Sequence, residues 1–375
     1  MAKTKVNGGN VFVVAGTSSG VFVLRSDAAR GRWEAGGPHL RGHSIDSVAF
    51  DGRAGRRRIW AGARHAHWGA TLAWSDDLGR TWARPETGAI RFPAESGSTL
   101  RRISAIQPGR TVEPDVLYCG TQPAALFVST DAGDIWRLCD GLFDHPDRHR
   151  WEPPDTGASL HSILPDPSIP RRIVVGIAAG GCYRTDDGGA SWTARNTGIR
   201  APFLPDPEPA SGQCVHRIVA APEGRMFLRN HAGVYRSDDS GETWKASGKG
   251  LPSEFGYAVA AHPRDRSIAW VVPLESEEFP CAPAGMLRVF RTMDGGRTWR
   301  AQAEGLPRVG AHETVSSGGL EADVLDPAGL YLGGRSGTVW ASRDEGSSWR
   351  EIVRGLPPVI CLKTVVIPEV GKGKR

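Results

Sequence analysis

A short motif with the pattern Ser/Thr-x-Asp-x-Gly-x-Thr/Ser-Trp recurs about every 50 residues along the chain. Six good copies begin at Ser75, Ser129, Thr185, Ser237, Thr292 and Ser342, and a weaker copy begins at Ser26. The copies close with tryptophans that are 49 to 56 residues apart: Trp33, Trp82, Trp136, Trp192, Trp244, Trp299 and Trp349. A regular period of this length is typical of repeat architectures, so we predict that residues 1–375 form one domain of seven units.

Each unit carries the signals of four short strands. A β-rich run ends in small residues such as Cys119-Gly120-Thr121, a second run leads into the motif, and a third contains the tryptophan. With 48 Gly and 27 Pro in 375 residues, a helix bundle is excluded. Units of four strands and about 50 residues predict an all-β, seven-bladed β-propeller with four-stranded antiparallel blades.

The motif itself is interpreted as hairpin chemistry. The Asp and Ser/Thr oxygens can accept backbone N–H groups within the turn, and the Gly permits a positive φ. A structural role is therefore assigned to the six carboxylates of Asp77, Asp131, Asp187, Asp239, Asp294 and Asp344.

The two ends of the chain are expected to complete one blade. The first unit begins at a second strand, residues 10–15, and the chain ends with a strand-like run at about 359–370, followed by a basic tail at 371–375. Pairing these ends would remove exposed sheet edges, which otherwise invite aggregation.

The motif resembles the Asp-box, or BNR, repeats of sialidases, related glycoside hydrolases and photosystem assembly factors. The chain is similar to a group of largely uncharacterised bacterial proteins described as sialidase-like or glycosyl-hydrolase-like. This resemblance implies that the boxes lie on one face of the ring and that a functional site lies on the other. A true sialidase is disfavoured, because Arg91-Phe92-Pro93 departs from the Arg-Ile-Pro motif of that family and Tyr257 is the one tyrosine suited to its nucleophile position.

Ten of the 11 histidines fall in loops expected on the functional face. His43, His161 and His216 precede three inner strands, so we expect them to point toward the mouth of the channel. Neutral imidazoles that converge there could bind a divalent metal ion, for which His43, His161, His216 and His231 are the candidate ligands. Surface or turn hydrogen bonding is the alternative for each of them.

The remaining candidates follow from glycosidase chemistry, which needs two carboxyl groups across the scissile bond. Glu275, Glu277 and Glu313, with His161 and His216, are the candidate catalytic residues, although a solvated acidic loop would explain the glutamates equally well. The candidate ligand-binding residues are His43, His65, His67, Trp68, Arg102, His231, Tyr257 and Arg335. Cys214, Cys281 and Cys361 also fall near the channel mouth.

Composition limits the class of function. The net charge of +5 is small, and the basic runs lack interleaved aromatics, so we expect no nucleic-acid partner. Apolar runs are much shorter than the roughly 20 residues of a membrane helix, and the first residues lack a signal core, so we expect no membrane association and a cytoplasmic location. Two functions remain open. One is a pocket that binds a small polar or anionic ligand such as a sugar derivative, with hydrolase- or lyase-like activity; the other is a noncatalytic scaffold that binds a partner protein.

Overall fold

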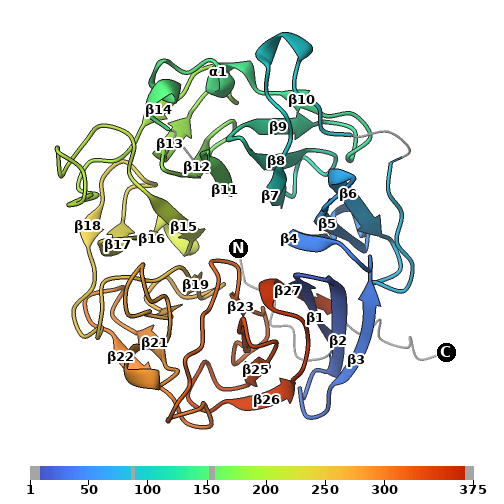
Figure 1. The fold of residues 1–375 in the computed structure, drawn as a ribbon, viewed down its shortest axis with the longest axis vertical. Coiled ribbons are helices and arrows are strands. Elements are labelled where there is room, and N and C mark those ends of the chain that lie inside the picture. Colours follow the sequence, from blue (N-terminus) through green and yellow to red (C-terminus); the bar gives the residue numbers. More distant parts are fainter. Residues whose placement is uncertain (1–8, 86–88, 152–156, 368–375) are drawn as a thin grey trace.

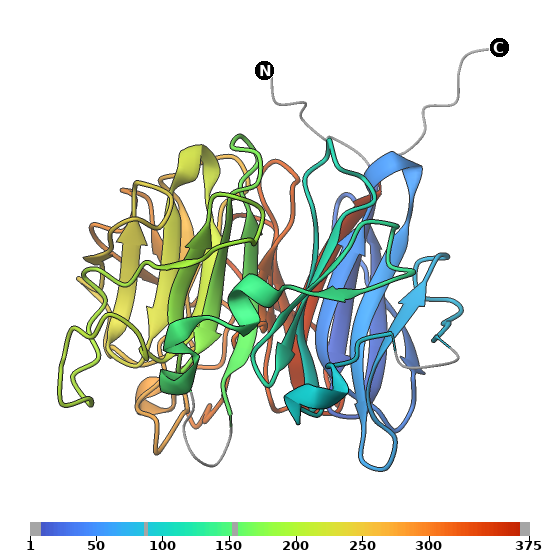
Figure 2. The ribbon, with the colours of Figure 1, turned by 90° about the horizontal axis from the view of Figure 1, so that it is seen from above.

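Seven antiparallel sheets are arranged in a ring in the computed structural model, which describes residues 9–85, 89–151 and 157–367 (Figure 1). Seen from the side, the strands run along the ring axis (Figure 2). The predicted seven-bladed propeller is confirmed. The predicted basic tail at 371–375 and the last three residues of the run 359–370 lie outside the described residues.

The blades are numbered in chain order, and the strands of each blade are given from the centre of the ring outward. Blade 1 comprises β27 (Val359–Ile367), β1 (Asn10–Thr17), β2 (Gly20–Asp27) and β3 (Glu34–His39). Blade 2 comprises β4 (Ser44–Asp51), β5 (Arg58–His65) and β6 (Gly69–Ser75). Blade 3 comprises β7 (Arg102–Pro108), β8 (Leu117–Gln122), β9 (Leu126–Ser129) and β10 (Arg137–Leu138). Blade 4 comprises β11 (Ser159–Pro165), β12 (Ile173–Ala178), β13 (Gly181–Thr185) and β14 (Thr193–Ala194).

The other three blades follow the same order. Blade 5 comprises β15 (Val215–Ala220), β16 (Met226–Asn230), β17 (Gly233–Ser237) and β18 (Lys245–Ala246). Blade 6 comprises β19 (Val259–Ala261), β20 (Ala269–Val271), β21 (Val289–Thr292) and β22 (Arg300–Gln302). Blade 7 comprises β23 (Leu320–Ala322), β24 (Leu330–Gly333), β25 (Val339–Ser342) and β26 (Arg350–Val353). One short α-helix, α1 (Asp140–Phe143), and five 3₁₀ turns lie in the connections that the structure describes.

Two details refine the predicted ring. β27 pairs antiparallel with β1, with Ile367 opposite Asn10 and Val365 opposite Phe12, so the expected closure by the two ends of the chain is confirmed. In blade 2 the fourth strand is reduced to a single bridge between Trp74 and Ala83. Among the described residues, no helix is long and apolar enough to cross a bilayer.

The six motif carboxylates bind within their own turns. In blade 4, Asp187 accepts hydrogen bonds from Thr185 Oγ1 (2.7 Å), from the Ser191 backbone N–H (2.9 Å) and from Ser191 Oγ (2.5 Å). Equivalent bonds from the preceding Ser or Thr hydroxyl are made by Asp77, Asp131, Asp239, Asp294 and Asp344. These hairpins, together with the connections between the first and second strands, define one side of the ring, which we call the box face.

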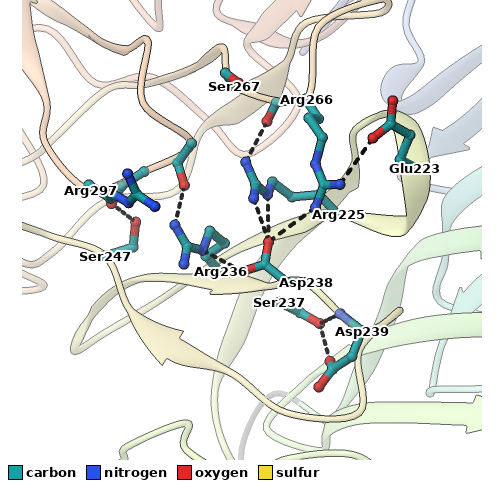
Figure 3. A network of polar contacts seen from close by, with 12 residues as sticks. Glu223, Arg225, Arg236, Ser237, Asp238, Asp239, Ser247, Arg266, Ser267 and Arg297 are labelled. Atoms are coloured by element: carbon teal, nitrogen blue, oxygen red, sulfur yellow. Dashed lines mark hydrogen bonds and ion pairs between the residues drawn. The ribbon is translucent and has the colours of Figure 1, made fainter.

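Ion pairs on the box face cross the strands and the blades. Asp238 lies beside Arg225 (2.6 Å) and Arg236 (3.1 Å) of its own blade and beside Arg266 (3.5 Å) of the next (Figure 3). Although burial raises the pKa of Asp238, the arginines hold it below its ordinary value. The charges of this face are thus used to hold neighbouring turns together.

Candidate functional site

A cavity of about 960 Å³ occupies the centre of the ring, between the innermost strands of the blades. Its walls carry charged and polar side chains from every blade. Those used below are Asp46, Arg102, Ser104, His161, His216, Arg217, Tyr257, Glu321, Arg335 and Lys363. We call this cavity the channel.

Four adjacent inner strands contain a β-bulge at the same level. On β4, Ile45 and Ser47 pair with consecutive residues of β5, so Asp46 is the extra residue. The same register shift leaves Ser104 unpaired on β7, His161 on β11 and His216 on β15. Because a bulge re-aims the side chain of the extra residue, four consecutive blades turn a polar group into the channel.

The two histidines among these bulge residues also link neighbouring blades. His161 Nε2 donates to the Val215 carbonyl (2.8 Å), and His216 Nδ1 donates to the Gly256 carbonyl (2.8 Å). Burial lowers the pKa of His161 to about 4 and that of His216 to about 3. Both rings are therefore neutral near pH 7, and a large part of their hydrogen-bonding capacity serves the fold.

Two carboxylates of the channel are paired with cations. Asp46, whose side chain is 4% exposed, lies 3.0 Å from Arg64 and 3.6 Å from Arg102. Glu321 lies 2.5 Å from Lys363 Nζ. Both pairs join the inner strand of one blade to a neighbouring strand or blade.

Two cations of the channel remain without such a partner. Neither the Arg217 nor the Arg335 guanidinium makes a hydrogen bond or ion pair with any residue in the described ranges. Arg217 is half-buried, and its Nε is buried without a partner. Tyr257 shares this wall; burial and the nearby Glu277 raise the pKa of its phenol, and Arg335 partly opposes them.

The structure brings some of the predicted site residues together and separates others. Arg102, His161, His216, Tyr257 and Arg335 line the channel as expected. His43, His65, His67 and Trp68 instead form a separate group at the rim of blade 2. Within it, the ring centroids of His43 and His65 are 5.0 Å apart, and those of His65 and Trp68 are 6.2 Å apart. The loop histidines therefore do not gather in one pocket.

Two of the four histidines predicted to bind a metal have both ring nitrogens engaged in this structure. His43 Nδ1 contacts the Arg41 carbonyl (3.1 Å), and Arg84 donates to His43 Nε2 (3.1 Å). His161 uses its second nitrogen to accept from the Ser162 hydroxyl (2.9 Å). With both ring nitrogens engaged, these two imidazoles offer no lone pair to a metal.

The three glutamates also occupy other environments than expected. Glu313 is buried and accepts bonds from the backbone N–H (3.0 Å) and the hydroxyl (2.5 Å) of Ser336, so it anchors the loop between β24 and β25. Glu275 is exposed. Glu277 is 64% exposed and lies 3.1 Å from His231 Nδ1. Glu275, Glu277 and Glu313 do not belong to the channel wall, so acid–base chemistry there would need other carboxyls.

Sequence reasoning missed three charged residues of the channel wall, namely Asp46, Glu321 and Lys363. It aligned His43 with His161 and His216, whereas the bulges show that Asp46 is their structural equivalent. A signal was present: in each case the residue is the second or third of the inner strand and directly follows a buried aliphatic residue. Of the thiols considered, Cys361 is buried, and burial raises its pKa to about 12.

The fold and the channel define the class of protein as a seven-bladed β-propeller with a polar central cavity. Xyloglucanase Xgh74A of Acetivibrio thermocellus is 24% identical over 305 residues, covering 70% of this chain and 35% of that enzyme. The oligoxyloglucan-reducing end-specific xyloglucanase of Emericella nidulans is 23% identical over 313 residues, covering 73% and 35%. The chain thus spans about a third of the length of these relatives, and no family model matches it.

Two solved structures show the same fold. The GH74 xyloglucanase from Xanthomonas campestris superposes with a TM-score of 0.62 at 18% identity, covering 95% of this chain and 56% of that one. YCF48 bound to a D1 peptide superposes with a TM-score of 0.51 at 15% identity, covering 83% of each chain. At these identities the likeness establishes the propeller architecture alone.

Proposed function

We propose that this protein is a glycosyl-hydrolase-like propeller that binds an anionic carbohydrate in its channel. The observation that carries the proposal is the pair of arginines, Arg217 and Arg335, that face the channel without a carboxylate partner in the described residues. A guanidinium binds a carboxylate or phosphate through two parallel hydrogen bonds, and this geometry suits a uronic acid or a sugar phosphate.

Charge supports an anionic ligand over a neutral one. Four cations line the channel, namely Arg102, Arg217, Arg335 and Lys363, and two carboxylates, Asp46 and Glu321, oppose them. Arg229, on β16, has a fully buried guanidinium whose two Nη atoms have no partner among the described residues, but it does not line the channel. Burial lowers the pKa of Arg229 to about 9, so it still carries its charge at neutral pH.

Tyr257 and the paired carboxylates suit the remainder of a sugar. An aromatic ring can pack against the apolar face of a pyranose, and Asp46 and Glu321 can accept hydrogen bonds from its hydroxyls. These carboxyls are also the pair in the channel that glycoside hydrolysis would require, in place of the predicted Glu275, Glu277 and Glu313. Ligand binding is thus the primary proposal, and hydrolysis depends on it.

Isothermal titration calorimetry would test the proposal. Oligosaccharides of galacturonic or glucuronic acid should bind, and neutral xyloglucan oligosaccharides of equal length should bind at least tenfold more weakly. Arg335→Ala should weaken the binding of the acidic ligand by about 10–100-fold, since a charged hydrogen bond contributes about 1.5–3 kcal/mol.

Arg354→Ala provides the matched control, because that arginine is 77% exposed and pairs with Glu351 outside the channel wall. Equal binding of acidic and neutral sugars, or an unchanged affinity of Arg335→Ala, would reject the anionic ligand. If acidic sugars bind, product analysis with Asp46→Asn and Glu321→Gln would show whether either carboxyl takes part in hydrolysis.

A scaffold that binds a partner protein is the second candidate. It is favoured by Trp68, which is 82% exposed in the turn between β5 and β6, because exposed tryptophans are enriched at protein interfaces. Failure of every sugar to bind, together with partner capture that Trp68→Ala abolishes, would favour this function. Under either function we propose a cytoplasmic location, which the six free cysteines support.

A further inference from the structure

One cluster of sulfur and nitrogen ligands lies at the rim of blade 5 and serves neither the anion-binding arginines nor the ring closure. Cys214 immediately precedes β15, His216 is the bulge residue of that strand, and His231 follows β16. One ligand atom from each of the three residues lies within 4.8 Å of the others. In the part of the chain that the structure describes, this is the one group of three such side chains.

Hydrogen bonds leave both imidazoles with a free lone pair. His216 donates its Nδ1 proton to the Gly256 carbonyl (2.8 Å), so its Nε2 is unprotonated. His231 Nδ1 lies 3.1 Å from Glu277 Oε2, which favours the tautomer that keeps the proton on Nδ1. Metal-binding histidines are held by the same arrangement, with a carbonyl or carboxylate on the nitrogen that does not bind the metal.

Neighbouring groups hold the ligands in place from several directions. The ring centroids of His216 and His231 are 4.5 Å apart, and Phe255 packs against both, at 5.6 and 5.5 Å. Gln213, next to Cys214, forms a bridge to Gly180 of blade 4. The ligands are therefore supported by two blades rather than by a single loop.

From this geometry we infer that Cys214, His216 and His231 form a binding site for one transition-metal ion, with Zn²⁺ the best fit. A thiolate and two imidazoles suit Zn²⁺, and three protein ligands leave a fourth tetrahedral position open. Ligand atoms around tetrahedral zinc are about 3.3–3.8 Å apart, so the side chains need to move inward by about 1 Å. Binding removes the proton of the Cys214 thiol and releases it to solvent.

The open position gives the site a role distinct from that of the channel arginines. His216 and Tyr257 both belong to the channel wall, and their ring centroids are 4.9 Å apart. A water or a ligand oxygen on the metal would thus be reached from the channel. The inference stands on the ligand set alone and holds whichever sugar or partner the channel takes.

Titration of the full-length, tag-free, metal-depleted protein with Co²⁺ and Zn²⁺ tests this site. We expect one Co²⁺ per chain, tetrahedral d–d absorption and a thiolate-to-cobalt charge-transfer band in the near ultraviolet, with all three signals displaced by Zn²⁺. Cys214→Ser should abolish the charge-transfer band and weaken metal affinity at least 100-fold. His231→Ala should weaken it to a similar degree, and Glu277→Gln by about 10–100-fold.

His67→Ala is the control, because His67 belongs to the exposed rim group of blade 2 and should leave stoichiometry and spectra unchanged. His216→Ala is avoided, since loss of the bond to Gly256 could unfold the blade. Circular dichroism should show that the variants used are folded. Absence of stoichiometric binding in the wild type would overturn the inference, as would a charge-transfer band that survives in Cys214→Ser or affinity lost equally in His67→Ala.

Discussion

The box face and the channel of this ring use charge in different ways. On the box face, Asp238 is surrounded by three arginines, and each motif carboxylate accepts hydrogen bonds from its own turn. In the channel, Arg217 and Arg335 make no ion pair within the described residues, and bulges turn single polar groups away from the sheet. The charges of the box face described here are all paired, whereas in the channel Asp46 and Glu321 are paired but Arg217 and Arg335 remain available to a ligand.

The largest effect should come from breaking a buried ion pair of the box face. Asp323 is 1% exposed and accepts bonds from Arg30 (3.2 Å) and Tyr331 (2.9 Å), which ties blade 7 to blade 1. Asp323→Ala should lower the free energy of unfolding by about 3–5 kcal/mol, because it leaves the Arg30 guanidinium buried without a counter-charge. Urea denaturation measures this loss.

Glu351→Ala is the control, because its exposed pair with Arg354 should contribute less than about 1 kcal/mol. Equal losses in the two variants would show that the buried pair has no special role in closing the ring.

Removing a channel cation should have the opposite pattern. Arg217→Ala should weaken the binding of an acidic oligosaccharide by about 10–100-fold. The free energy of unfolding should stay unchanged or rise slightly, because the substitution removes an unpaired, half-buried charge. Calorimetry and thermal melting of the same variant measure the two quantities. A large loss of stability would instead identify Arg217 as a structural residue.

A single motif carboxylate should have a moderate effect confined to stability. Asp187→Ala removes bonds to Thr185 and Ser191 and should cost about 1–2 kcal/mol, comparable to the loss of a helix N-cap, without changing ligand affinity. Comparison with Arg217→Ala under the same conditions would distinguish the structural role of the box face from the ligand-binding role of the channel. A tenfold fall in ligand affinity would argue that the faces are coupled.

The smallest effects should appear as two separate pH windows. Burial lowers the pKa of His161 from 6.5 to about 4, so the unfolded chain binds the proton first and stability falls as the pH drops through this range. Hydrogen bonds from Thr81 lower the pKa of Asp77 from 3.8 to about 2, so its contribution is present above pH 3.8 and is lost as the pH falls toward 2.

His161→Gln should flatten the pH dependence of unfolding only between about pH 6.5 and 4, and Asp77→Asn only between about pH 4 and 2. Urea denaturation at a series of pH values measures both slopes. If the two variants had identical stability–pH profiles, the assignment of one pH window to the channel and the other to the box face would be wrong.

The sequence predicted the fold far better than the site. The spacing of Trp82, Trp136 and the other motif tryptophans indicated seven units, and the unpaired run at the end of the chain indicated the closing strand. For the site, equivalence of His43 with His161 was inferred from position alone. A bulge shifts the register by one residue, and this shift reverses which side chains face the channel.

What the sequence by itself determined is the ring, because each box is closed by hydrogen bonds between residues two to four positions apart, such as Thr185, Asp187 and Ser191. Only the tertiary structure decided which polar groups meet. His216 contacts Gly256 and His231 contacts Glu277, which are 40 and 46 residues further along the chain. The packing of one blade against the next brings these residues together. Local bonds leave a periodic trace in the chain, whereas contacts between blades depend on register and curvature, which no short segment encodes.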